Sequence, residues 1–140
     1  MFTQLKQLLE QSRQFSNDYW HDCALFEAES CLQSFQAHDW LDLENCLPEQ
    51  SAYWKLRCID TLHAFPSVSG LTVLAALCDD NHKETALAAA RSLLDLNKKN
   101  CWPSEIASSL QYHLHKAQTT VSKHSLFDAL HRRFFFKPAA

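Results

Sequence analysis

Residues 71–96 read LTVLAALCDDNHKETALAAARSLLDL, and this stretch indicates the fold of the whole chain. Its first part carries apolar residues at the spacing of one helix face, namely Leu71, Leu74, Ala75 and Cys78. After a polar break at residues 79–81, a second apolar stripe comprises Ala86, Ala90, Leu93 and Leu94, with Leu87 beside it. The many alanines would let this second helix approach a neighbour closely. Two helices joined by a tight polar turn form an antiparallel hairpin with one shared apolar side.

This hairpin resembles a HEAT-type helical repeat. It has a Leu-rich first helix, an acidic turn and an Ala-rich second helix that carries an arginine within AAARSLL. The chain departs from the family pattern early in the second helix, where HEAT repeats usually have a basic residue and this chain has Ala86 and Leu87. The resemblance implies a stacked, right-handed array of helices used as a binding surface, and it implies no catalytic chemistry.

The composition predicts an all-α fold. One glycine and four prolines in 140 residues leave few of the turns that β-architectures need, whereas long segments rich in Leu, Ala, Gln, Ser and Glu favour helices. This length suits a single helical domain over residues 1–140. Apolar periodicity predicts up to four helix pairs, at 2–35, 39–65, 69–97 and 103–136, with the last made of helices at 104–117 and 122–136. We predict antiparallel hairpins stacked as a short HEAT-like array, and an irregular helical bundle is the alternative.

Several helix boundaries can be predicted from capping residues. Ser16 or Asn17 is suited to cap the second helix, which runs to about residue 35. Asp39 is suited to cap the short helix that carries Trp40, Leu43 and Leu47. Pro66 and Gly70 are predicted to bracket the turn into the central hairpin.

The charges of this chain are segregated along the sequence. Residues 14–54 contain eight acids and no lysine or arginine, whereas residues 98–140 have seven basic and two acidic residues. The overall net charge of −3 therefore hides one acidic and one basic end.

The acidic stretch also contains large aromatic residues. Carboxylates speed the encounter with a basic protein surface, and aromatic side chains beside them can anchor the complex. The alternative is that the acids form a solvated face and the aromatics belong to the core. The predicted partner-binding residues are Asp18, Trp20, Asp22, Glu29, Asp39, Trp40, Asp42, Glu44 and Trp54.

No motif indicates catalysis, and we expect no enzyme activity and no cofactor. A single glycine excludes both a GxSxG elbow and a Gly-rich phosphate loop. The eight histidines and six cysteines show no zinc-ligand spacing, so no metal site is expected. The scattered cysteines are typical of reduced, buried thiols in a cytoplasmic protein. No apolar run reaches membrane length and the N-terminus lacks a signal-peptide pattern, so a cytoplasmic location without a membrane partner is expected.

The leading functional hypothesis is a small binding protein that neutralises a basic protein partner. In general type the chain resembles the immunity proteins of bacteria, which protect cells from toxins, many of them nucleases with basic active sites. The acidic-aromatic surface would then cover the cationic cleft of the toxin domain. A second hypothesis is a HEAT-like adaptor that scaffolds a larger assembly. Direct nucleic-acid binding through Lys123, Arg132 and Arg133 is not expected, because the chain as a whole is acidic.

Overall fold

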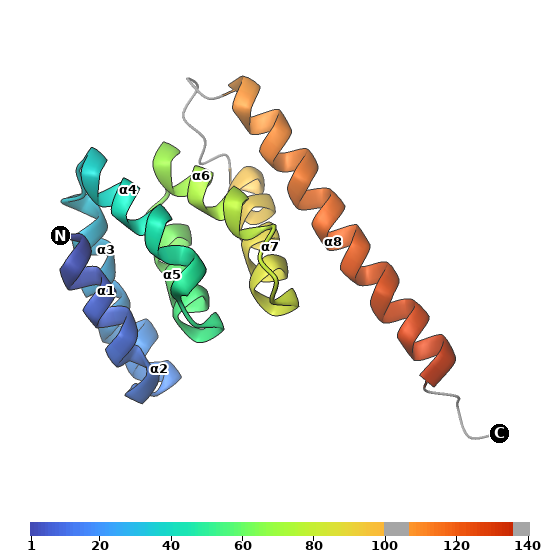
Figure 1. The fold of residues 1–140 in the computed structure, drawn as a ribbon, viewed down its shortest axis with the longest axis horizontal. Helices are drawn as coiled ribbons and strands as arrows, with labels where there is room; N and C mark the ends of the chain where they lie inside the picture. Colours follow the sequence, from blue (N-terminus) through green and yellow to red (C-terminus); the bar gives the residue numbers. More distant parts are fainter. Residues whose placement is uncertain (100–106, 136–140) are drawn as a thin grey trace.

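A computed structural model describes residues 1–99 and 107–135, with side chains of the last helix described from residue 111 to residue 125. Within these ranges the secondary structure is helical and contains no strand, which confirms the all-α fold (Figure 1). The α-helices are α1 (Phe2–Gln11), α2 (Asn17–Tyr19), α3 (Leu25–Gln33), α4 (Ala37–Cys46), α5 (Ala52–Ala64), α6 (Val68–Leu77), α7 (Lys83–Lys98) and α8 (Ala107–Phe135). Short 3-10 helices at Ser12–Gln14 and Leu47–Glu49 and a π-helix at Trp20–Ala24 lie between them. Across the described part of the chain, no helix has the length and apolar character needed to cross a membrane.

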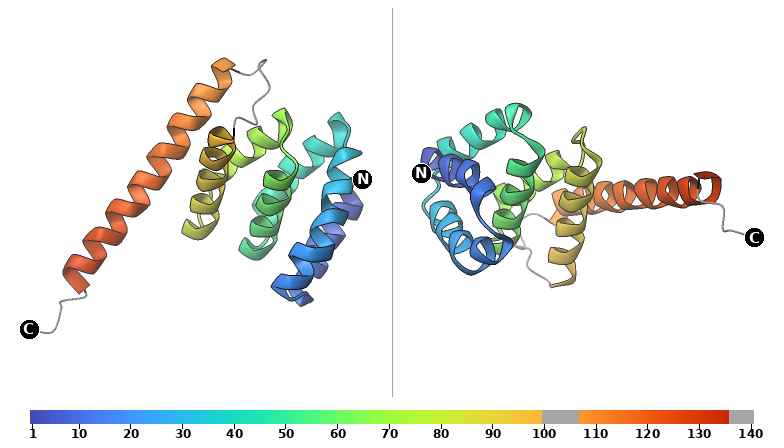
Figure 2. Two further views of the ribbon diagram at one scale, coloured as in Figure 1. Left: turned by 180° about the vertical axis from the view of Figure 1, so that it is seen from behind. Right: turned by 90° about the horizontal axis from the view of Figure 1, so that it is seen from below.

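Three antiparallel hairpins in two layers are formed by α1 and α3 to α7, and the short α2 leads through the π-helix into α3. One layer contains α1, α4 and α6, and the other contains α3, α5 and α7 (Figures 1 and 2). α8 follows α7 at the end of the array and diverges from it toward the C-terminus (Figure 1). Each hairpin therefore buries its apolar side against the next hairpin.

The central hairpin has the structure that its sequence predicts. Residues 71, 74, 75 and 78 of the first stripe are buried, and the polar break becomes the turn between α6 and α7. In α7, Ala89 and Ala90 are fully buried, and Ala117 of α8 is fully buried as well. Small side chains at these positions allow the helices to pack at short range.

Serine side chains define the start of three helices. The Ser16 Oγ accepts a hydrogen bond from the Tyr19 N–H at 3.1 Å, which confirms the predicted cap. Ser51 and Ser67 cap α5 and α6 in the same way. The turn before α6 was predicted to extend to Gly70, but this glycine lies inside the first turn of α6. A Cβ at Gly70 would lie 3.1 Å from the Ser67 Oγ and 3.3 Å from the Leu62 Cδ2, so glycine allows the start of α6 to approach α5 closely.

The predicted fourth helix pair is wrong, because one continuous helix, α8, occupies residues 107–135. The expected break near residues 118–121 contains Thr119 and Thr120, which are poor helix formers. Their hydroxyls donate to the carbonyls of His115 and Lys116, one turn earlier, at 2.9 Å each. These bonds satisfy the hydroxyls within the helix, so the threonines do not end it. The predicted ends at 104 and 136 lie outside the described residues.

Candidate partner-binding surface

The helical segment from α2 through the π-helix to α3 presents one acidic and aromatic face to solvent. Its core side consists of Trp20, Ala24 and Ala28, which recur every four residues and are each at most 1% exposed. An ideal α-helix would rotate such a series around its axis, but the π-helix at Trp20–Ala24 has i→i+5 bonds and a wider turn. The wider turn keeps the series on the core side over this part of the segment.

The opposite side of the segment carries two rows of exposed residues. Asp18, Asp22 and Phe26 form one row, and Tyr19, Cys23 and Glu27 form the next; all six are exposed. We call these six residues the acidic helix face. Phe26 is 64% exposed and Tyr19 is 49% exposed, although both are large and apolar. Exposed aromatics bordered by charge mark interaction sites, and π turns are frequent at functional sites.

Trp20 does not belong to this face, so its predicted role as a binding anchor is wrong. Its side chain is fully buried, and its indole Nε1–H donates to the Asp60 Oδ2 at 3.0 Å. The Arg57 guanidinium lies over the Trp20 ring at 4.9 Å and over the Tyr53 ring at 5.0 Å. Trp20 therefore joins the first hairpin to α5.

Trp54 and Trp40 are also structural. Trp54 is 2% exposed, and its indole Nε1–H donates to the backbone carbonyl of Lys6 at 3.3 Å. Trp40 is half-buried and packs edge-on against Phe35, with ring centroids 5.0 Å apart. The prediction that the tryptophans anchor a partner is therefore contradicted for Trp54, and most of the Trp40 ring contacts the protein itself.

Asp39 is a structural residue as well, which contradicts its predicted role in binding. It is 4% exposed and lies at the third position of α4, where Gln36 rather than Asp39 is the N-cap. One carboxylate oxygen accepts the Gln36 N–H at 2.9 Å, and the other accepts the Phe2 N–H at 3.1 Å. The Gln36 bond is the main cause that lowers the pKa of Asp39 below its ordinary value. Asp39 thereby ties the start of α1 to the start of α4.

The remaining predicted acids lie on two layers. Asp42 and Glu44 are exposed on α4, whereas Asp18 and Asp22 belong to the acidic helix face and Glu29 is half-buried on α3. Asp42 and Glu44 are two residues apart and point to different sides of α4. The predicted carboxylates therefore form one compact group on the first hairpin and a looser group on the second.

Seven of the eight acids between residues 14 and 54 have no cationic partner within the described residues. Ion pairs in these ranges involve other acids, such as Asp80 with Lys55 and Asp95 with His63. The seven unpaired acids are Asp18, Asp22, Glu27, Glu29, Asp42, Glu44 and Glu49. Their negative potential is therefore directed to solvent rather than neutralised by the chain.

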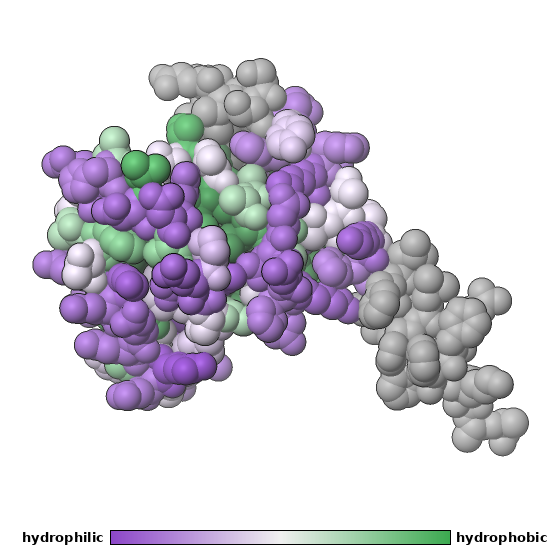
Figure 3. All heavy atoms as spheres, viewed as in Figure 1, coloured by the Kyte–Doolittle hydropathy of each residue, from purple (hydrophilic) through white to green (hydrophobic). Residues whose placement is uncertain are grey.

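Apolar surface is present on the other layer. On the face drawn in Figure 3, hydrophobic residues gather over α4 and α6, whereas the described part of α8 is hydrophilic. Leu41 on α4 is 58% exposed and Val68 at the start of α6 is 40% exposed. This surface lies apart from the acidic helix face, because α4 and α6 belong to the layer opposite α3.

Cys58, Cys78 and His63 lie in structural surroundings. Burial raises the pKa of the Cys58 thiol, and it raises the pKa of the Cys78 thiol to about 11, so both stay protonated near neutral pH. Over the ranges that the structure describes, no three or more His, Cys, Asp or Glu residues form a group that could hold a metal ion. His63 Nε2 lies 2.8 Å from the Asp95 Oδ2 and links α5 to α7.

Comparison with known proteins identifies no relative: no family, no curated protein and no solved structure matches this chain. The candidate surface is therefore defined by the geometry of this chain alone.

Sequence reasoning assigned Asp18 and Asp22 of this surface to partner binding but not Glu27, and it missed Phe26. The signal was present, because Phe26 follows Asp18 and Asp22 at intervals of four residues. Residues four apart share a face of a regular α-helix but drift slowly around its axis, and the wider turn of the π-helix at Trp20–Ala24 counteracts this drift.

Proposed function

We propose that this chain is a non-catalytic, HEAT-like binding protein that recognises a basic protein through the acidic helix face. The observation that carries the proposal is the set of seven acids without a cationic partner in the described residues, four of which lie on one helical segment beside Tyr19 and Phe26. Unpaired carboxylates accelerate association with a cationic surface, and exposed aromatics slow dissociation.

An immunity protein against a basic toxin, such as a nuclease, is the class that this surface supports best. The toxin would lose activity because the acidic helix face covers its cationic substrate-binding cleft. The buried thiols and the structural role of His63 are consistent with a protein that acts by occlusion. Such a protein would act in the cytoplasm, where it would meet the toxin domain.

Charge reversal on the acidic helix face tests this proposal. The variant Asp18→Lys/Asp22→Lys should reduce the association rate with the partner by about tenfold or more at low salt. Both side chains are exposed on the proposed contact surface, so the reversed charges would repel a basic partner as it approaches. The partner would be captured with tagged wild-type chain from its source cells and identified by mass spectrometry, and rates would be measured by surface plasmon resonance. Protection of growth against the identified toxin should fall in parallel.

The matched control is Asp42→Lys/Glu44→Lys, which changes the net charge by the same amount on the other layer. A smaller loss of association rate in this control is expected if the acidic helix face is the contact. Equal losses in both variants would show that only net charge matters and would contradict the proposed contact surface. Circular dichroism should show unchanged helicity in both variants. Asp39 is left intact because its substitution would damage the fold.

Truncation of the exposed aromatic is the second test. Phe26→Ala should raise the dissociation rate of the complex by about tenfold or more, since exposed aromatics are frequent hot spots. The free energy of unfolding should change by less than about 0.5 kcal/mol, because the side chain is 64% exposed. The control is Leu41→Ala, which removes a comparably exposed apolar side chain from the other layer.

A second function, as an adaptor in a larger assembly, is favoured by the apolar surface on α4 and α6. For an adaptor that binds there, Leu41→Ala should weaken capture of the partner while Phe26→Ala leaves it unchanged. The association rate would then change little with salt, in contrast to recognition by charge.

A further inference from the structure

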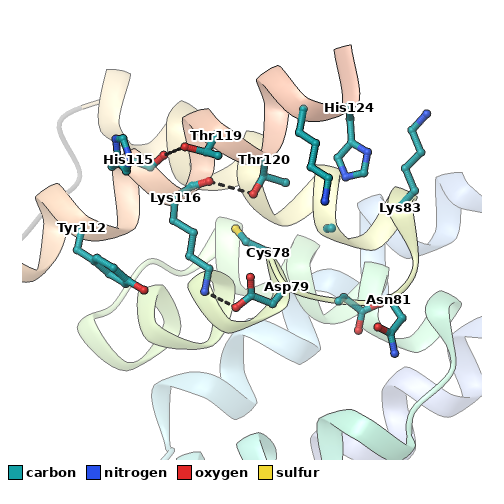
Figure 4. A pocket seen from close by; sticks show the side chains of 13 residues that line it. Cys78, Asp79, Asn81, Lys83, Tyr112, His115, Lys116, Thr119, Thr120 and His124 are labelled. Carbon is teal, nitrogen blue, oxygen red and sulfur yellow. Dashed lines mark hydrogen bonds and ion pairs between the residues drawn. The ribbon is translucent and has the colours of Figure 1, made fainter. Parts of the chain in front are cut away.

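A groove of about 720 Å³ lies between the α6–α7 turn and α8 (Figure 4). Its floor comes from the segment that runs from Cys78 through the start of α7, and its wall comes from the part of α8 between Tyr112 and His124. The groove opens because α8 diverges from α7 toward its C-terminus (Figure 1). Its volume lies within the range of pockets that hold small molecules and cofactors.

Basic groups outnumber acidic groups in and beneath this groove. Lys83, Lys116 and Lys123 line it together with two imidazoles, those of His115 and His124. The acidic groups that line it are Asp79 and Asp80.

Both carboxylates already have lysine partners. The Lys55 Nζ donates to the Asp80 Oδ1 at 2.6 Å from beneath the turn, and Lys116 reaches from α8 to Asp79 (Figure 4). Each aspartate is therefore paired with a lysine, and Lys123 lines the groove in addition, in a chain whose overall net charge is −3. The groove is a local region of positive charge, which attracts anions.

The wall of the groove also presents an exposed aromatic ring beside these charged groups. Tyr112 is 66% exposed at one end of the groove, and His124 points from α8 toward the turn at the other end (Figure 4). An exposed tyrosine ring can stack on a planar ring, and lysine and imidazole N–H groups can donate to phosphate oxygens.

We propose that this groove binds a phosphate-bearing small molecule of nucleotide size. Lys123 and His124 contact the phosphates, Lys116 joins them by exchanging its bond to Asp79, and Tyr112 stacks on the ring. This site is separate from the acidic helix face, which lies on the first hairpin at the other end of the array (Figure 1). A test that contradicts one of the two proposals therefore does not contradict the other.

The test is a titration of the full chain with ATP in metal-free, low-salt buffer, followed by amide chemical shifts in NMR spectra. Saturable shifts are expected at residues 78–86 and 112–124. Lys123→Glu/His124→Gln should weaken ATP binding by about tenfold or more, because hydrogen bonds to charged groups are lost. The matched control, Lys98→Glu, reverses an exposed lysine outside the groove and should leave the affinity within about twofold.

Two further ligands separate the contributions of phosphate and ring. Inorganic pyrophosphate should saturate the same residues, and Tyr112→Ala should weaken ATP binding while leaving pyrophosphate binding unchanged. Tight binding of adenosine alone would overturn the assignment to phosphate. Shifts that do not saturate, or an equal loss of affinity in Lys98→Glu, would show general attraction to lysines and would overturn the proposed site.

Discussion

Replacing Trp20 by alanine is expected to lower the free energy of unfolding by about 3–5 kcal/mol, the cost of removing a large buried aromatic side chain. Trp20 is fully buried, so its loss leaves a cavity between the first hairpin and α5. The substitution also removes the donor to Asp60 and the ring that lies under the Arg57 guanidinium. Arg57 keeps its hydrogen bonds to Tyr53 and Asn17, so part of the polar network survives. Urea denaturation followed by circular dichroism measures this loss.

Trp20→Phe separates packing from hydrogen bonding. Phenylalanine fills most of the space but cannot donate to Asp60, so this variant should lose less stability than alanine, with about 1 kcal/mol due to the missing bond. Burial raises the pKa of Asp60, while the bond from Trp20 and the charge of Arg57 lower it. Loss of the bond should therefore raise the pKa of Asp60 further, which a pH titration of its carboxyl carbon by NMR can follow.

The linked pH dependence has a definite sign. A carboxyl group whose folded pKa lies above its unfolded pKa destabilises the fold when it is ionised. Its folded state binds more protons, so stability rises as the pH falls through the folded pKa. This rise should be larger in Trp20→Phe than in the wild type. A cost below about 1 kcal/mol for Trp20→Ala would instead be typical of a surface side chain and would contradict the buried position.

The central hairpin could be predicted because local and tertiary signals agree there. Helical spacing, the acidic turn and the small residues of α7 all indicate the same antiparallel pair. The first helix and the Ser16 cap could be predicted for the same reason. The division of α8 into two helices was predicted incorrectly, because the helix continues through residues 118–121, where the hydroxyls of Thr119 and Thr120 bond within it.

The candidate surface could be predicted only in part, because burial of a polar or aromatic side chain depends on tertiary contacts. Asp18 and Asp39 are the same residue type in the same acidic stretch, yet one is exposed and the other accepts two backbone N–H groups. The Phe2 donor is distant in sequence from Asp39, and no local pattern indicates the contact. Tyr19 and Trp20 are adjacent but differ in burial, again because of contacts that are distant in sequence. The Trp20 side chain contacts Asp60 and Arg57 of α5, whereas the Tyr19 side chain is exposed.

Replacing Lys55 by methionine is expected to destabilise the fold by about 3–5 kcal/mol, the cost of leaving a buried charge without its partner. The side chains of Lys55 and Asp80 are only 9% and 11% exposed, and their charged atoms are 2.6 Å apart. Asp80 also accepts the His82 N–H at 3.0 Å, so its carboxylate holds the α6–α7 turn against α5. Methionine keeps most of the length of the lysine stem, which limits the loss of packing.

A double-mutant cycle with Asp80→Asn isolates the ion pair. Lys55→Met/Asp80→Asn should lose less stability than the two single variants together, with a coupling of about 1–3 kcal/mol, because neither buried charge remains unpaired. The exposed pair between Lys116 and Asp79 provides the control, since the Asp79 side chain is 71% exposed and Asp79→Asn should cost about 0–1 kcal/mol. Additive losses in the Lys55 cycle would show that solvent already screens the pair. The α6–α7 turn would then be held by its backbone bonds and apolar contacts, and adjacent aspartates 79 and 80 would be equivalent despite their different burial.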